Sequence, residues 1–251
     1  MIAVVLVTHN SQVFLQETVT SINSQTKQPD IMIAVDDLST DGTQTLLHSH
    51  GFQVVSATST STDITTRVAQ NFVQGVRQAH QQGATTVVLG DHDDIWRNNR
   101  IQHQADYLAN NPRIAFMASD GKTTEFETLR ATFPVPVDFN EWDRDQQWRY
   151  TAKHSIATGG ASAIAPDRLS TLEVPEGWLH DRWWSLRAVR ESSMAIDSEV
   201  VIDYRLSAGQ QVGLDTQGQG NPVMRILNKF RDIPRNARKM KNISHLLSET
   251  K

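Results

Sequence analysis

The sequence contains no cysteine, which excludes disulfide bonds, thiolate metal sites and cysteine nucleophiles. No segment is apolar over the length needed to span a bilayer, and internal repeats are absent. Residues 1–8 lack a basic segment and a small-residue cleavage site, so we expect a β-strand there and not a signal peptide. These absences favour a protein that stays in the cytoplasm.

Charge is unevenly distributed along the chain. The formal net charge of the 251 residues is -4, yet the segment 225–251 is rich in lysine and arginine. The acidic body argues against a nucleic-acid partner, whereas the basic tail could meet anionic lipid, a partner protein or solvent. A length of 251 residues with 38% hydrophobic content fits one large soluble α/β domain with a modest appendage.

Hydrophobic patterning predicts strands and helices that alternate. Apolar runs typical of buried parallel strands are followed by stretches with helical spacing, which indicates a doubly wound, mostly parallel sheet. We expect strands at 2–7, 31–35, 52–55, 86–89, 114–117, 159–165, 195–196 and 200–205, and helices at 65–80, 100–108 and 178–186. The pattern is weak between residues 120 and 157.

The tetrapeptide Asp91-His92-Asp93-Asp94 directly follows the apolar run 86–90. A strand that ends there delivers three carboxylates to the edge of the sheet where ligands bind in open α/β folds. Crowded carboxylates raise one another's pKa unless a cation neutralises them, and hard divalent metals with oxygen ligands do so. The alternative is an acidic turn that caps the next helix.

Two further polar turns are expected at the same edge. Residues 8–10 follow the first strand, and Asp36 and Asp37 follow the second. Together, the three turns suit a nucleotide: a carboxylate can accept from a base N–H, and helix N-termini and a metal can face a diphosphate. Each acidic turn alone could equally be a helix cap.

Six strings in this order carry a family resemblance: VTHN, VDDLSTDGT, LGDHDDIW, GGASA, WLHDRWW and IDYRLSAGQQVG. They resemble the family 2 glycosyltransferases of the GT-A fold, and within them the rhamnosyltransferase-like branch that builds surface polysaccharides. The resemblance covers residues 1–213. It implies a Rossmann-like, mixed but mostly parallel central sheet flanked by helices. A nucleotide-binding half (about 1–118) and an acceptor-binding half (119–213) would precede a basic amphipathic helical tail (214–251).

The resemblance also implies an activity. An inverting enzyme of this kind moves a sugar from a UDP- or dTDP-linked donor to a hydroxyl of a saccharide or lipid-linked acceptor, with Mn²⁺ or Mg²⁺ as cofactor. Carried over residue by residue, it assigns the donor nucleotide to Thr8, Asn10, Asp36, Asp37, Arg67, Asp93 and Arg205, and the metal to Asp91, Asp93 and Asp94. Arg67 has the alternative of a solvated arginine on a helix face.

Transfer to a hydroxyl requires a base, because the acceptor proton must leave as the C–O bond forms. The resemblance assigns this role to Asp181, which could otherwise be a helix N-cap. It suggests Gly160, His180 and Trp183 as acceptor contacts, although a histidine beside a base is often only packed, and most of the tryptophans belong to the core.

One departure from the family pattern concerns Ser207, which stands where relatives often have a histidine that helps bind metal or diphosphate. This keeps open a catalytically silent sugar-nucleotide-binding or scaffold protein. A nucleotidyltransferase would need a glycine- and lysine-rich loop near the N-terminus, and a glycosidase would need no nucleotide turn. The basic tail predicts either peripheral binding to the inner face of the membrane or a helix packed on the body.

Overall fold

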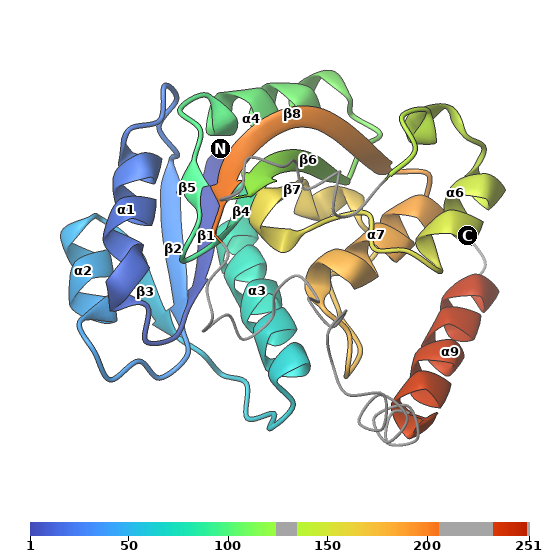
Figure 1. The fold of residues 1–251 in the computed structure, drawn as a ribbon, viewed down its shortest axis with the longest axis horizontal. Helices are drawn as coiled ribbons and strands as arrows, with labels where there is room; N and C mark the ends of the chain where they lie inside the picture. Colours follow the sequence, from blue (N-terminus) through green and yellow to red (C-terminus); the bar gives the residue numbers. More distant parts are fainter. Residues whose placement is uncertain (124–134, 206–232, 250–251) are drawn as a thin grey trace.

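The computed structural model describes residues 1–123, 135–205 and 233–249. Within them, one mixed eight-stranded sheet has the order β3-β2-β1-β4-β7-β6-β8-β5 (Figure 1). The strands are β1 (Ile2–Thr8), β2 (Ile31–Asp36), β3 (Gln53–Ser56), β4 (Thr86–Asp91), β5 (Ile95–Trp96), β6 (Phe116–Thr123), β7 (Ser162–Ile164) and β8 (Met194–Tyr204). The first four in spatial order are parallel, β7 is antiparallel to both of its neighbours, and β8 is parallel to β6.

Helices cover both faces of the sheet. They are α1 (Gln12–Asn23), α2 (Thr43–Ser49), α3 (Ile64–Gln81), α4 (Arg100–Asn110), α6 (Arg144–Thr151), α7 (His180–Arg190) and α9 (Ile233–Ser248). Alternate strand residues face opposite cores: Val5 belongs to the cluster that includes residues of α3 and α7, whereas Val4 belongs to the cluster that includes residues of α1, α2 and α4. This period of two explains why the central strands are apolar throughout their length.

The register of the central strands brings the polar turns together. Thr8 on β1 lies opposite Asp36 on β2, and Val7 on β1 lies opposite Asp91 on β4. The carboxyl ends of these three strands therefore meet at one edge of the sheet, as the apolar runs predicted.

The acceptor half differs from the sequence expectation in two places. The strand expected at 159–165 is a 3₁₀ turn (Gly159–Ala161) followed by the three-residue β7. The chain bends at the two glycines, whose backbone lies too close to neighbouring side chains for a Cβ. The two short strands expected at 195–196 and 200–205 form the single long β8, which arches over β6 in Figure 1. A bulge in the β6–β8 pairing accommodates its polar middle.

The described part of the tail is the helix α9, which packs on the body. Leu246 is buried, Arg238 forms an ion pair with Glu176 (2.8 Å), and Lys239 lies over the ring of Trp178. The helix α9 therefore packs on the body through one face, and a membrane contact through its exposed side chains stays a prediction. The proposed domain boundary at residue 213 and the departure at Ser207 lie outside the described residues.

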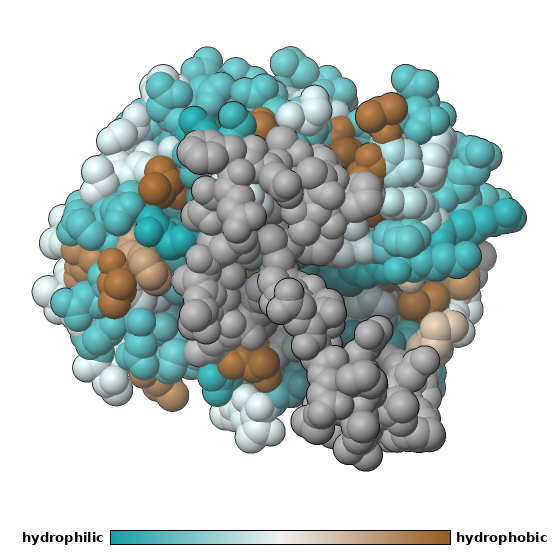
Figure 2. All heavy atoms as spheres, viewed as in Figure 1, coloured by the Kyte–Doolittle hydropathy of each residue, from teal (hydrophilic) through white to brown (hydrophobic). Residues whose placement is uncertain are grey.

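No helix in the described ranges is long and apolar enough to cross a membrane. Figure 2 shows that the described surface on this face is mostly hydrophilic, with hydrophobic side chains in small separate groups.

Candidate active site

The turn after β2 is organised by Asp36, which is buried and accepts four hydrogen bonds. The donors are Thr8 Oγ1 (2.9 Å), the Ser39 amide (3.1 Å), Ser39 Oγ (2.6 Å) and Gln44 Nε2 (2.7 Å). A carboxylate with this many donors is committed to shaping its turn. Asp36 and Thr8 were both expected to contact the nucleotide. Through these hydrogen bonds they instead hold the turn in place beneath the site.

Asp37 is the carboxylate of this turn that faces another functional group. Its Oδ2 lies 2.8 Å from Nε of Arg67 on α3, and its backbone amide donates to the carbonyl of Thr8. Arg67 is therefore not merely a solvated arginine on a helix face. The pair places a cation and an anion side by side at the edge predicted to bind a nucleotide.

Asn10 connects the first two turns. Its side-chain oxygen accepts from the amide of Thr40 (2.8 Å), and its own amide donates to Ser39 Oγ (2.8 Å). Its backbone has a positive φ of 47°, a conformation that asparagine tolerates better than most residues. Through these bonds Asn10 holds the turn after β1 against the turn after β2.

The acidic turn after β4 is buried and caps no helix. Asp94 has no exposed surface and Asp93 is 4% exposed. The next helix, α4, begins after Asn99 without a side-chain cap, and β5 intervenes. The capping alternative for this turn is therefore wrong.

Asp91 and Asp94 converge on Gly160. A Cβ added to Gly160 would lie 2.6 Å from Oδ2 of each carboxylate, so only glycine fits here. Burial, with the charges of Asp93 and Asp181, raises the pKa of Asp91 to about 7. Burial, with Asp91 and Asp93, also raises the pKa of Asp94 well above its usual range, and its Oδ2 has no hydrogen-bond partner among the described residues. This crowding creates a demand for a cation.

Arg100, which no sequence motif marks as functional, lies behind this turn. It is fully buried, donates from Nη2 to the carbonyl of Leu89 (2.5 Å), and stacks on Trp96 with 3.8 Å between Cζ and the ring centroid. Burial lowers its pKa to about 9, while Asp94 and Asp91 act in the opposite direction. An arginine in the first turn of a helix is unfavourable with the helix dipole, so the acidic turn is its compensating partner.

Asp181 lies in the first turn of α7 and is not its N-cap, which is Leu179. The carboxylate accepts from the amides of Gly159 (3.0 Å) and Arg182 (2.6 Å). Burial raises the pKa of Asp181 to about 6, and these two amides oppose the shift. Because Gly159 contacts Asp181 and Gly160 contacts Asp91 and Asp94, two consecutive residues join the donor-side acids to the expected base.

His180 and Trp183 are core residues. His180 is 3% exposed and stacks on Phe72 (3.8 Å between centroids), and burial lowers its pKa to about 3. Trp183 is also 3% exposed and packs against Trp178. Neither side chain is open to an acceptor, so the geometry does not support the acceptor role expected for them. Gly160 instead serves the close approach described above.

The end of β8 completes the site. Arg205 donates from its amide to Asp94 Oδ1 (3.3 Å), from Nε to the carbonyl of Asp93 (3.1 Å) and from Nη2 to Glu17 (2.9 Å). It thereby holds the acidic turn against α1. Tyr204 is a second site residue that no sequence motif indicated. Burial and four nearby carboxylates, chiefly Asp91 and Asp94, raise the pKa of Tyr204.

The described residues contain no group of three or more His, Asp or Glu side chains arranged to hold a metal alone. The oxygens of Asp91, Asp93 and Asp94 are nevertheless the ligand type that Mg²⁺ and Mn²⁺ prefer, and Asp94 Oδ2 is buried without a partner. A catalytic Mg²⁺ commonly takes one or two carboxylates and completes its shell with substrate phosphates and water. The residues present fit such a shared site.

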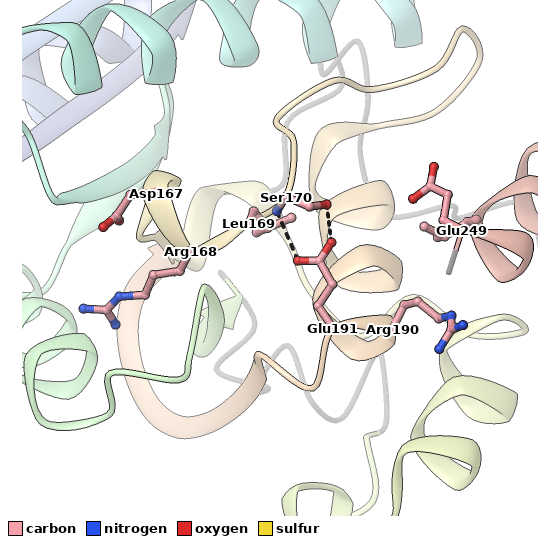
Figure 3. A pocket seen from close by; sticks show the side chains of 8 residues that line it. Asp167, Arg168, Leu169, Ser170, Arg190, Glu191 and Glu249 are labelled. Atoms are coloured by element: carbon pink, nitrogen blue, oxygen red, sulfur yellow. Dashed lines mark hydrogen bonds between the residues drawn. The ribbon is translucent and has the colours of Figure 1, made fainter. Parts of the chain in front are cut away.

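A cavity of about 400 Å³ lies at the C-terminal end of α7. Figure 3 shows it between residues 167–170, the end of α7 and α9, with Ser170 donating to Glu191. Its charged side chains are largely engaged with each other or with backbone: Arg168 donates to three carbonyls, and Glu249 accepts from Arg187. This cavity is distinct from the edge that carries the acids.

Comparison with protein families identifies the chain. Residues 3–163 match the model of glycosyl transferase family 2. The chain belongs to this family. No curated protein sequence matches it.

Solved structures share the fold of this family 2 member at low sequence identity. S. aureus TarS 1-349 in complex with UDP is 14% identical, with a TM-score of 0.58 over 82% of this chain and 60% of that chain. The mannosyltransferase PcManGT from Pyrobaculum calidifontis, in complex with GDP-Man and Mn²⁺, is 16% identical, with a TM-score of 0.53 over 85% and 58%. Glucosyl-3-phosphoglycerate synthase from Mycobacterium tuberculosis, with Mn²⁺, UDP and glucosyl-3-phosphoglycerate, is 17% identical, with a TM-score of 0.52 over 82% and 72%.

These comparisons confirm the expected fold and the family. They do not distinguish a rhamnosyltransferase-like branch within it. The chain spans about 60% of the TarS 1-349 structure that it matches.

Proposed function

We propose that this protein transfers a sugar from a nucleoside-diphosphate donor to an acceptor hydroxyl, with inversion at the anomeric carbon. The observation that carries the proposal is the junction at Gly159 and Gly160. Gly159 donates to Asp181, and Gly160 lies against Asp91 and Asp94. A donor held by the acids of β4 would thus present its anomeric carbon near a carboxylate suited to deprotonate the acceptor.

Asp181 is the proposed base. Its pKa, raised to about 6 by burial, leaves most of the carboxylate ionised at neutral pH and still able to take a proton. As the acceptor oxygen bonds to the anomeric carbon, its proton passes to Asp181. The bond from that carbon to the diphosphate oxygen breaks, and the electron pair leaves with the nucleoside diphosphate. Attack in line with the leaving group inverts the anomeric configuration.

On the donor side, Asp37 and Arg67 are proposed to contact the nucleoside, and Asp93 and Asp94 to hold a divalent metal with the diphosphate. When bound, Mn²⁺ or Mg²⁺ would neutralise the charge that develops on the leaving diphosphate. Arg205 and Arg100 keep the acidic turn in place from two sides. Three of the similar solved structures are complexes with UDP, with GDP-Man and Mn²⁺, and with UDP and Mn²⁺, which supports this donor class.

The donor proposal is tested by a binding panel. UDP-, dTDP- and GDP-sugars are titrated into the protein with and without Mn²⁺ or Mg²⁺, and the thermal midpoint is recorded. We expect a UDP- or dTDP-linked sugar to raise the thermal midpoint more than a GDP-linked sugar does, and we expect the rise to be larger when the metal is present. Asp94→Ala should abolish the metal-dependent part, whereas Asp106→Asn, an exposed control, should not. Absence of binding by every donor would defeat the proposal.

We further propose that the acceptor is a saccharide or lipid-linked saccharide used in surface polysaccharide synthesis, met at the inner face of the cell membrane. The support is the basic helix α9, on which Met240 and Leu247 remain 61% and 46% exposed. Exposed apolar and basic side chains on one helix favour anionic lipid surfaces. Sedimentation with phosphatidylglycerol vesicles should fall for the Met240→Ser, Lys241→Glu double variant. Equal sedimentation of wild type and variant would exclude this contact.

A further inference from the structure

Leu38, in the turn after β2, has a backbone that a leucine rarely adopts. Its φ is +58°, in the left-handed region where Cβ crowds the following carbonyl oxygen. Asparagine and glycine are the usual residues there. The sequence therefore keeps an unfavourable residue at this position.

Bonds on both sides hold Leu38 in this conformation. Before it, Asp37 is fixed by its amide bond to Thr8 (2.8 Å) and by its ion pair with Arg67 (2.8 Å). After it, Ser39 donates from its amide and hydroxyl to Asp36 (3.1 and 2.6 Å). The strained residue cannot relax without breaking the turn, so the direction of its Cα–Cβ bond is fixed.

The Leu38 side chain gains no compensation from packing, since the residue is 73% exposed. Residues held in strained backbone conformations cluster at active sites and ligand clamps, and such a site would also explain the exposed apolar side chain. The hydrophobic gain is then realised only when the ligand covers it.

The position of Leu38 indicates which part of a donor it would meet. It directly follows the carboxyl end of β2, and β1 separates β2 from β4, which carries the acidic turn. Two strand spacings separate β2 from β4 by roughly 10 Å, so Leu38 lies to one side of the acids that face a diphosphate. In a nucleoside diphosphate the base lies at the end opposite to the phosphates, and its ring faces are apolar.

We propose that Leu38 is an apolar contact for the base of the donor nucleotide, held in place at the expense of backbone strain. This inference rests on the proposed donor class. It adds to the polar pair of Asp37 and Arg67 an apolar surface that binds the nucleoside and not the phosphates.

The test combines two measurements on Leu38→Gly. Glycine relieves the strain, so the thermal midpoint of the free protein should rise by about 2 °C. Loss of the apolar contact should weaken the affinity for UDP and dTDP about tenfold, while inorganic pyrophosphate with Mn²⁺ binds as in wild type. A residue that serves only the fold would instead lower the midpoint when replaced.

Two further variants separate strain from contact. Leu38→Ala keeps the left-handed residue with a Cβ, so affinity for UDP and dTDP should fall without a rise in the midpoint. Val137→Ala removes a fully exposed apolar side chain outside this turn and should change neither quantity. If Leu38→Gly bound UDP and dTDP as tightly as wild type, this inference would be wrong while the proposed function stood. If wild type bound no nucleotide, both would be overturned.

Discussion

Replacement of Asp181 by asparagine should stabilise the protein, because the wild-type carboxylate is held in a costly environment. Burial raises its pKa from the usual 3.8 to about 6, against the two amides that favour the ionised form. Since the folded pKa lies above the unfolded one, the carboxyl favours the folded state at low pH. That contribution is lost as the pH rises through about 6, and the ionised group then destabilises the fold.

The size of the effect follows from the two pKa values. A shift from 3.8 to about 6 corresponds to about 3 kcal/mol at pH 7, of which about half remains at pH 5 and about 0.5 kcal/mol at pH 4. Asparagine has no charge to desolvate, and its side-chain oxygen can still accept from the amides of Gly159 and Arg182. We therefore expect a gain of about 3 kcal/mol at pH 7, or about 6 °C in the thermal midpoint.

Urea denaturation of wild type and Asp181→Asn at pH 4, 5 and 7 measures this gain. Asp106→Asn is the matched control, because its carboxylate is 53% exposed and its loss should change stability by less than about 0.5 kcal/mol at each pH. A gain that shrinks steadily from pH 7 to pH 4 supports the account. A destabilised variant at pH 7, or a gain independent of pH, would refute the reasoning.

Three further substitutions test the packing around the site and the tail. Gly160→Ala should cost about 1–3 kcal/mol and abolish Mn²⁺-dependent binding of UDP in calorimetry, since its Cβ would lie 2.6 Å from two carboxylate oxygens; unchanged binding would contradict the convergence of these acids. Arg100→Met should cost about 3–5 kcal/mol in urea denaturation, because it leaves the buried acids without their cation, and a cost below about 1 kcal/mol would show that Arg100 is not their counter-charge. Leu246→Ala should cost about 2–3 kcal/mol and expose α9 to limited proteolysis; resistance equal to wild type would argue against its docking.

The nucleotide-binding half could be predicted from the sequence because its strands are continuous apolar runs. Such runs fix parallel strands, and parallel strands fix where their ends meet, so Thr8, Asp36 and Asp91 were expected at one edge. The acceptor half gave weaker signals. Short polar strands and glycine bends depend on distant partners, which is why the 3₁₀ turn before β7 and the continuous β8 were missed.

Within the site, the sequence indicated residue types but not burial. His180 and Trp183 stand beside Asp181 in the chain, yet the helical turn rotates them into the core while Asp181 faces Gly159. The burial of Arg100 could not be predicted, because a single arginine at the start of a helix is usually exposed to solvent. The positive φ of Leu38 was equally hidden, since residue identity alone argues against it.

The central claim, sugar transfer with Asp181 as base, is tested most directly by comparing donor binding with turnover in Asp181→Asn. With a donor selected from the panel and Mn²⁺ present, wild type should transfer the sugar to an acceptor sugar or to water and release free nucleoside diphosphate. The variant should bind the donor with unchanged affinity and turn over about 10²–10⁴-fold more slowly. Turnover equal to wild type would contradict the account.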